Sequence, residues 1–324
     1  MAFPFAGKKV LVTGGAGFIG SHVADRLVEE GCRVHVLDDL SGGVRENVPD
    51  AAAFHELDVR SDGVRDLFER ERFDALCHLA AQMDVRRSVA DPVFDAEVNV
   101  LGLLNLMEAG RETGLRKVAF ASTGGAIYGE PDPSVNGGGP QPEEHPTRPM
   151  SPYGITKLVS EHYLRFYEQT HGVPFVSLRF GNVYGPRQNP HGEAGVVAIF
   201  TERLLRGEPV TINGEGTQTR DYVYVGDVVR AFVSALAHDG SGVFNVGTGV
   251  ETDVNALFRH INRHTGAGAE EQYGPAKPGE QQRSVLDTQH AERTLGWRPE
   301  TDVAAGLAET VEWFRQREGA GSKG

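Results

Sequence analysis

Tyr153 and Lys157 have the types and the spacing that proton-transfer chemistry needs. They lie four residues apart in a segment that we predict to be helical, so their side chains share one face. A free tyrosine has a pKa of about 10, and a nearby ammonium group lowers it by stabilising the phenolate. Thr123 follows an apolar run and adds a hydroxyl that we expect at the same crevice. The three groups predict a proton relay acting on a secondary alcohol.

A Tyr–Lys pair also occurs on the surface of many helices, so the interpretation depends on the elements around it. Residues 10–20 (VLVTGGAGFIG) begin with an apolar strand and continue through Gly14, Gly17 and Gly20, spaced three apart, into an amphipathic helix. An ordinary glycine turn is the alternative. The strand before the glycines and the helix after them favour a cradle in which backbone N–H groups and the helix N-terminus hold a pyrophosphate.

Two acidic residues, Asp38 and Asp58, are candidate contacts of a dinucleotide. Asp38 ends the run Arg33–Leu37, and an acid at this place accepts hydrogen bonds from an adenosine ribose and repels a 2′-phosphate. The sequence therefore predicts NAD rather than NADP. We expect the positive charge of an oxidised nicotinamide to act together with Lys157 in lowering the pKa of Tyr153. Asp58 is a candidate acceptor for the adenine amino group, and the alternative of a helix cap or a surface acid stays open.

Strands and helices alternate along the chain, which predicts an α/β fold with a doubly wound, Rossmann-like parallel sheet. We expect an NAD-binding domain over residues 1–180, a smaller α/β substrate lobe over 181–318 that is partly interleaved with it, and a disordered tail over 319–324. A long amphipathic helix is predicted over Val93–Arg111. The Pro- and Gly-rich residues 130–150 are expected to form a flexible loop over a site.

The composition excludes several classes of protein. The 324 residues include 32 basic and 45 acidic side chains, and the net charge of −13 argues against a nucleic-acid partner. We interpret this acidity as a solubility feature. Two cysteines, Cys32 and Cys77, predict no disulfide framework. No apolar run reaches membrane-spanning length, so we expect a cytoplasmic protein without membrane contact, and we predict no metal site.

The ordered motifs resemble those of a known family. The pattern G-x-x-G-x-x-G, a threonine after the fourth strand and Y-x-x-x-K are similar to those of the extended short-chain dehydrogenase/reductases. The runs SPYGITK, LRFGNVYGPRQ, TRDYVYVGDV and KPGE–R–S–LD resemble the nucleotide-sugar epimerase branch, and most of all the UDP-glucose 4-epimerases. The resemblance covers nearly the whole chain. It implies an isomerase of carbohydrate metabolism that uses bound NAD to invert C4 of a UDP-hexose, through a 4-keto sugar.

The resemblance also implies roles for individual residues. The catalytic positions are Thr123, Tyr153 and Lys157. The positions implied for NAD are Gly14, Gly17, Phe18, Ile19, Asp38, Asp39, Leu40, Ser41, Gly42, Asp58, Val59, Leu79, Ala80, Ala81, Gln82, Asn99, Ser122, Tyr153, Lys157 and Phe180. The positions implied for the UDP-sugar are Thr123, Tyr153, Asn182, Gly195, Val196, Thr211, Ile212, Asn213, Arg220, Arg283 and Ser284.

Departures from related enzymes narrow the expected reaction. Thr123 is followed by two glycines, whereas the 4,6-dehydratases carry Thr-Asp-Glu and the UDP-glucuronate decarboxylases carry Ser-Glu at this place. Those reactions need an additional acid or base, which glycine cannot supply, so epimerisation remains. The alternatives are a UDP-glucuronate 4-epimerase or another nucleotide-sugar-modifying enzyme of the family, such as a reductase that releases NADH. A non-catalytic sensor of NAD or nucleotide sugar has no need for the intact trio.

Two further expectations follow from the resemblance. Ser284 aligns with a wall beside the sugar's 2-substituent, where narrower enzymes carry tyrosine, which predicts that N-acetylhexosamines also fit. Gln281 or Gln282 filling that space is the alternative. We expect a homodimer formed through helices 93–111 and 153–170, in which Leu103, Met107 and Leu164 face either the partner or the core.

Overall fold

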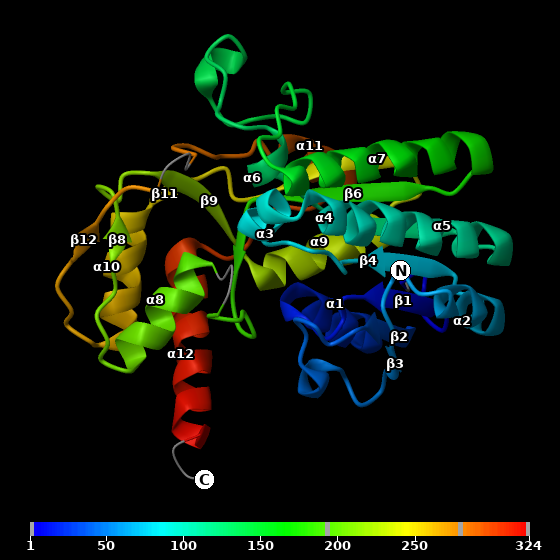
Figure 1. The fold of residues 1–324 in the computed structure, drawn as a ribbon, viewed down its shortest axis with the longest axis horizontal. Coiled ribbons are helices and arrows are strands. Elements are labelled where there is room, and N and C mark those ends of the chain that lie inside the picture. The colour runs from blue at the N-terminus through cyan, green and yellow to red at the C-terminus, as the bar shows by residue number, and fades with distance from the viewer. Residues whose placement is uncertain (1–2, 192–194, 278–280, 322–324) are drawn as a thin grey trace.

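A computed structural model describes residues 3–191, 195–277 and 281–321, and its centre is a parallel sheet with helices on both faces (Figure 1). The strands are ordered β10-β6-β5-β4-β1-β2-β3. Their bounds are β1 Lys9–Thr13, β2 Arg33–Asp38, β3 Ala53–Glu56, β4 Ala75–His78, β5 Lys117–Thr123, β6 Phe175–Phe180 and β10 Gly242–Val246. The order reverses between β1 and β4, where doubly wound sheets bind their ligands. The predicted fold class is confirmed.

The sheet is buried on both faces because successive side chains of a strand point to opposite sides. Val10 and Val12 pack into one core cluster and Leu11, between them, into another. The first cluster includes residues of α1 (Phe18–Glu29) and α9 (Val225–Ala237). The second includes residues of three helices, α2 (Gly63–Glu71), α5 (Gly102–Thr113) and α7 (Pro152–His171). The continuous apolar runs in the sequence reflect this double coverage.

A smaller lobe lies beside the sheet and has its own apolar cluster (Figure 1). It contains two small sheets, β11-β9-β7 and β12-β8. Its elements are β7 Asn182–Tyr184, α8 Val196–Leu205, β8 Ile212–Asn213, β9 Thr219–Tyr224, β11 Glu251–Asp253, α10 Val254–Thr265, β12 Tyr273–Gly274 and α12 Val303–Gly321. Strand β10 returns to pair with β6 in the main sheet, and α11 (Gln289–Leu295) packs near it. The division at residue 180 remains our proposal for where the substrate lobe begins.

The long helix predicted over 93–111 is interrupted. It consists of α4 (Pro92–Ala96), a π-helical turn (Glu97–Leu101) and α5. The turn contains Asn99, whose backbone carbonyl accepts a hydrogen bond from the Ser160 hydroxyl of α7 at 3.2 Å. A π turn inside an α-helix often marks a functional site. Short helices precede and follow this segment, namely η1 Arg45–Asn47, α3 Val85–Ala90, α6 Gly124–Ile127 and η3 Asn136–Gly138.

Two other expectations need correction, and the alternative left open for Leu103, Met107 and Leu164 is decided in favour of the core. Residues 319–321 continue α12 rather than beginning a tail, since each extra helical residue adds a backbone bond to the turn before it; residues 322–324 lie outside the described part. Leu103, Met107 and Leu164 are fully buried in the core. The loop 130–150 extends away from the sheet near α6 (Figure 1) and pairs instead with the segment 281–287, through bonds such as Gln141 N–H to the Val285 carbonyl.

Both cysteines are buried and free, as predicted from their number and positions. Among the described residues, no helix is long and apolar enough to cross a membrane. No group of three or more His, Cys, Asp or Glu side chains within that same part of the chain is arranged to hold a metal ion.

Candidate active site

A cleft of about 2160 Å³ runs along the carboxyl ends of the sheet strands and continues into the smaller lobe. A pocket for one small ligand typically measures roughly 300–1,000 Å³. The cleft therefore has room for a dinucleotide and a second nucleotide-sized ligand together.

Most of the predicted site residues line this one cleft, although they come from distant parts of the chain. The predicted residues in its lining are Gly14, Gly17, Phe18, Ile19, Asp38, Asp39, Ser41, Gly42, Asp58, Val59, Leu79, Ala80, Ala81, Gln82, Ser122, Thr123, Tyr153, Lys157, Phe180, Asn182, Gly195, Val196, Thr211, Asn213 and Arg220. The predicted residues outside the lining are Leu40, Asn99, Ile212, Arg283 and Ser284.

The glycine turn between β1 and α1 fits a pyrophosphate. Gly14 has a φ of +69°, in the left-handed region that favours glycine, and a Cβ there would lie 2.7 Å from the backbone nitrogen of Ala80. A Cβ on Gly20 would collide with the Gly14 carbonyl oxygen. No side chain caps the N-terminus of α1 at Gly17, so its N–H groups and positive dipole end are available to an anion.

A buried hydroxyl joins this turn to the loop after β4. The Thr13 Oγ1 lies 2.7 Å from the His78 Nδ1 and accepts the N–H groups of Leu79 and Ala80, each at 3.3 Å. Burial lowers the pKa of His78 to about 3. The Thr13 hydroxyl thereby holds the loop after β4 against the end of β1, where the glycine turn begins.

Asp38 lies beside the glycine turn at the end of β2. Its carboxylate accepts the N–H of Ala16 at 3.0 Å and that of Leu40 at 2.9 Å. Burial raises the pKa of Asp38, and the two backbone hydrogen bonds oppose the rise. Each carboxylate oxygen has a second lone pair for a ribose hydroxyl. Leu40, which has a φ of +57°, contributes this backbone N–H and packs against the core instead of lining the cleft.

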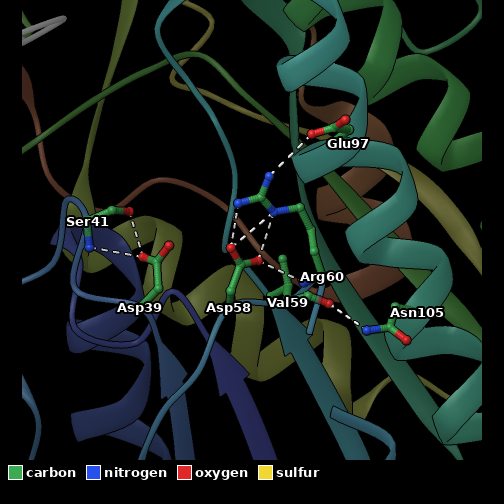
Figure 2. A network of polar contacts seen from close by, with 7 residues as sticks. All are labelled: Asp39, Ser41, Asp58, Val59, Arg60, Glu97 and Asn105. Atoms are coloured by element: carbon green, nitrogen blue, oxygen red, sulfur yellow. Dashed lines mark hydrogen bonds and ion pairs between the residues drawn. The ribbon is translucent and has the colours of Figure 1, made fainter. Parts of the chain in front are cut away.

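Figure 2 shows a polar network at the end of the cleft where Asp58 lies. The Arg60 guanidinium donates to the Asp58 carboxylate, with 2.6 Å between Nη2 and Oδ2, and forms an ion pair with Glu97 at 3.4 Å. These hydrogen bonds lower the pKa of Asp58. Asn105 donates to the Val59 carbonyl at 2.9 Å from the opposite side. The turn that carries Asp58 is therefore fixed at two points.

The catalytic trio comes from two elements. Thr123 ends β5, and its hydroxyl oxygen accepts the Ala126 N–H at 3.2 Å, which leaves the hydroxyl proton free to donate to a ligand. Tyr153 and Lys157 lie in the first two turns of α7, whose N-terminus is capped by the Ser151 hydroxyl. All three residues line the one cleft, where the sequence analysis expects them.

In the described part of the chain, the Lys157 ammonium bonds a backbone carbonyl rather than the Tyr153 hydroxyl. The Lys157 ammonium donates to the Ala121 carbonyl at 2.9 Å, and it lies 5.9 Å from the centre of the Tyr153 ring. Burial raises the pKa of Tyr153, and the nearby Asp95 carboxylate adds to the rise. Burial lowers the pKa of Lys157 to about 8. The expectation that Lys157 acts together with the positive charge of an oxidised nicotinamide to favour the phenolate stays a prediction.

The five predicted residues outside the lining have other contacts. Asn99 bonds the backbone of Gln82, donating to its carbonyl and accepting its N–H, both at 2.9 Å. Arg283 is paired with Glu251 and bonds the Gly138 carbonyl. Ile212 is buried in the smaller lobe's core. Ser284 is 1% exposed, and its Oγ lies 4.0 Å from where a Cβ on the cleft residue Gly125 would stand.

Several residues of the site were not found from the sequence. Arg60, Arg187 and Gln188 line the cleft. Arg60 follows Asp58 by two residues, and this proximity to a predicted site residue would have been enough to predict that Arg60 also lies at the cleft. Arg187 forms an ion pair with Asp25 of α1 at 2.7 Å, and that contact across 162 residues has no local signature.

Comparison with known proteins shows the family to which this chain belongs. Residues 10–247 match the NAD dependent epimerase/dehydratase family, and the chain belongs to that family. The expected NAD-dependent enzyme of the extended short-chain dehydrogenase/reductase type is thereby confirmed.

Within the family the chain is similar to enzymes named UDP-glucose 4-epimerase. One from Mycolicibacterium smegmatis is 46% identical over 315 residues, which cover 95% of this chain and 99% of that protein. A Thermotoga maritima UDP-glucose 4-epimerase crystallised with UDP-glucose is 48% identical, with a TM-score of 0.93 over 96% of this chain and 99% of that one. The Thermus thermophilus enzyme in complex with NAD is also 48% identical, with a TM-score of 0.88 over 95% and 99% of the two chains.

Proposed function

We propose that this protein uses bound NAD to invert C4 of a UDP-hexose, interconverting UDP-glucose and UDP-galactose, and that it also accepts the N-acetylhexosamine forms. The observation that carries the proposal is that Thr123, Tyr153 and Lys157 line one cleft whose arms fit a dinucleotide and a second nucleotide. The residues after Thr123, Gly124 and Gly125, offer no acid or base for elimination of water. The relatives named UDP-glucose 4-epimerase support the same reaction.

Bound NAD would supply an acceptor for the hydride of C4 and, once reduced, a donor for its return. Its pyrophosphate would be held by the glycine turn, its adenosine ribose by Asp38 and its nicotinamide ribose by Lys157. The Tyr153 phenolate takes the proton of the sugar's 4-hydroxyl and later returns it. The Thr123 hydroxyl donates to the same sugar oxygen, because its own oxygen is already oriented by the Ala126 N–H.

The 4-keto sugar has to present its other face before the hydride returns. Arg220 lines the arm of the cleft in the smaller lobe, where its guanidinium can pair with the diphosphate oxygens. This anchor keeps the intermediate bound while the sugar turns. We place the turning sugar beside Gly125, which lines the cleft without a side chain and where a Cβ would lie 4.0 Å from both Asn182 Oδ1 and Ser284 Oγ.

The test is incubation of the purified protein with UDP-glucose or UDP-galactose without added NAD, followed by nuclear magnetic resonance. We expect both substrates to reach the same mixture, and NAD to be released when the protein is denatured. A protein that needs stoichiometric NAD and accumulates NADH is a dehydrogenase instead. A parallel incubation with UDP-glucuronate tests the alternative substrate.

We also propose a homodimer. Apolar side chains of α4, the π turn and α7 are exposed, including Val93 at 67%, Leu101 at 56% and Phe166 at 47%. Contiguous exposed apolar surface typically marks a contact with another protein. Light scattering during gel filtration should give twice the chain mass, and Leu101→Glu with Phe166→Glu should give a monomer. A wild-type monomer contradicts the proposal.

The cytoplasm remains the proposed location. Cys32 and Cys77 are buried without a disulfide, which is typical of a reducing compartment. Fractionation of the source cells tests this placement.

A further inference from the structure

Asp95 is a fully buried acid beside the catalytic helix, and the proposed reaction does not use it directly. It lies in α4, the helix that packs against α7, and its side chain is inaccessible to solvent. Burying a charge is costly unless hydrogen bonds compensate it. The free-energy cost of burying this carboxylate must therefore be offset by its contacts or by its function.

The donors that hold this carboxylate come from three segments of the chain. Oδ1 accepts from Gln82 Nε2 at 2.8 Å and from Asn99 Nδ2 at 3.2 Å. Oδ2 accepts from the Thr156 hydroxyl at 2.8 Å. These donors are uncharged, so within the described part of the chain no hydrogen-bond partner of Asp95 carries a positive charge.

Two of the three donors connect Asp95 to the site. Gln82 lines the cleft in the loop after β4, and Thr156 precedes Lys157 on α7 and is three residues after Tyr153. Asn99 also holds the backbone of Gln82. Asp95 is thus one hydrogen bond from the turn of α7 that carries Tyr153 and Lys157, and charges buried in protein are weakly screened.

We propose that Asp95 is a positioning residue of the epimerase site: its buried charge keeps the Lys157 ammonium charged and keeps Tyr153 a neutral phenol until oxidised nicotinamide binds. The inference rests on the proposed function. A negative charge stabilises a neighbouring cation and destabilises a neighbouring anion. The proton is consequently released from the phenol only when an oxidised cofactor, which can accept the hydride, is in place.

The directions of the pKa shifts agree with this role. Burial raises the pKa of Tyr153 and Asp95 raises it further, whereas burial lowers the pKa of Lys157 to about 8 and Asp95 opposes that fall.

The other charged or titratable groups around α4 are paired with an opposite charge, neutral, or exposed to solvent. On α7, Glu161 is paired with Arg179 at 2.6 Å. His78 of β4 is neutral because burial lowers its pKa to about 3. Arg86 and Arg87 of α3 are exposed, and Glu97 of the π turn is partly exposed, so water screens them.

The geometry permits a variant that removes only the charge. In Asp95→Asn, the amide oxygen can keep the bonds from Gln82 and Asn99, while the amide N–H₂ donates to the Thr156 hydroxyl, which can accept as well as donate. Asp91→Asn is the matched control on the same helix. Asp91 is exposed and caps α4 by accepting the Phe94 N–H at 3.1 Å, and asparagine caps a helix equally well.

The decisive measurement is a pH titration of the tyrosinate absorption in the NAD-loaded protein, with the spectrum of the corresponding Tyr153→Phe protein subtracted. We expect Asp95→Asn to lower the apparent pKa of Tyr153, with at least about a threefold change in the ionisation constant. The acid limb of kcat/KM should move to lower pH by the same amount. Asp91→Asn should leave both unchanged.

An unchanged titration in Asp95→Asn overturns the proposal, as does a loss of activity at every pH without a shift, which indicates a structural role. If Asp95→Asn does not fold, the smaller uncharged variant Asp95→Ser should give the same shift. The titration requires NAD but no turnover. A wild-type protein that epimerises no UDP-sugar therefore refutes the proposed function, while the titration still decides the role of Asp95.

Discussion

The buried ion pair between Glu161 and Arg179 gives a prediction whose size follows from the structure. The side chains are 5% and 7% exposed, and the pair is joined by Nη2–Oε2 at 2.6 Å and Nε–Oε1 at 3.0 Å. Oε1 of Glu161 also accepts the hydroxyls of Ser122 at 2.6 Å and Ser177 at 3.0 Å. Glu161→Gln keeps the shape but places an N–H₂ against the guanidinium and leaves a buried cation unpaired.

Breaking a buried pair in this way typically costs about 3–5 kcal/mol, out of a total stability of roughly 5–15 kcal/mol. The assay is urea unfolding monitored by circular dichroism. The dependence of the unfolding free energy on urea concentration should be the same in the wild type and the variants. Glu112→Gln is the control, since its pair with Arg65 has side chains 40% and 56% exposed and should contribute about 1 kcal/mol or less.

A loss in Glu161→Gln no larger than in Glu112→Gln refutes the reasoning. The double variant Glu161→Leu with Arg179→Met should recover most of the loss, because it leaves no buried charge.

Three further predictions concern the site and the pH dependence of stability. Tyr153→Phe should abolish turnover while UDP binding by calorimetry stays nearly unchanged, and substantial remaining activity would identify another base. Ser284→Tyr should suppress the N-acetyl substrates selectively, because its added ring would point toward Gly125; equal losses for both substrate types, or no N-acetyl activity in the wild type, contradict the assignment. His35 contacts His55 at 3.0 Å, and burial lowers its pKa to about 4. Because the unfolded chain binds the proton more readily, stability should fall as the pH drops from about 6.5 to about 4, by at most about 3 kcal/mol. His35→Phe should reduce that dependence in urea unfolding, and an unchanged slope against pH would exclude His35 as its source.

Local patterns in the sequence were enough to predict the sheet and the cofactor arm of the cleft. The glycines at 14, 17 and 20, the acid Asp38 and the Tyr153–Lys157 spacing each act over a few residues. Their geometry follows from backbone sterics and helix periodicity, which a sequence carries directly. The Ser151 cap and the end of β5 at Thr123 were readable for the same reason.

Only the tertiary structure decided the electrostatics of the site. Burial raises the pKa of Tyr153, the Asp95 carboxylate, 58 positions away, adds to the rise, and the Lys157 ammonium bonds Ala121 rather than the phenol. Asn99 proved to hold the Gln82 backbone, and Arg283 proved to pair with Glu251. A residue type states which interactions are possible, but desolvation and long-range pairing are set by what the fold packs around it. The sequence thus determined most of the groups that meet at the cleft, and the packing determined their burial and their hydrogen-bond partners.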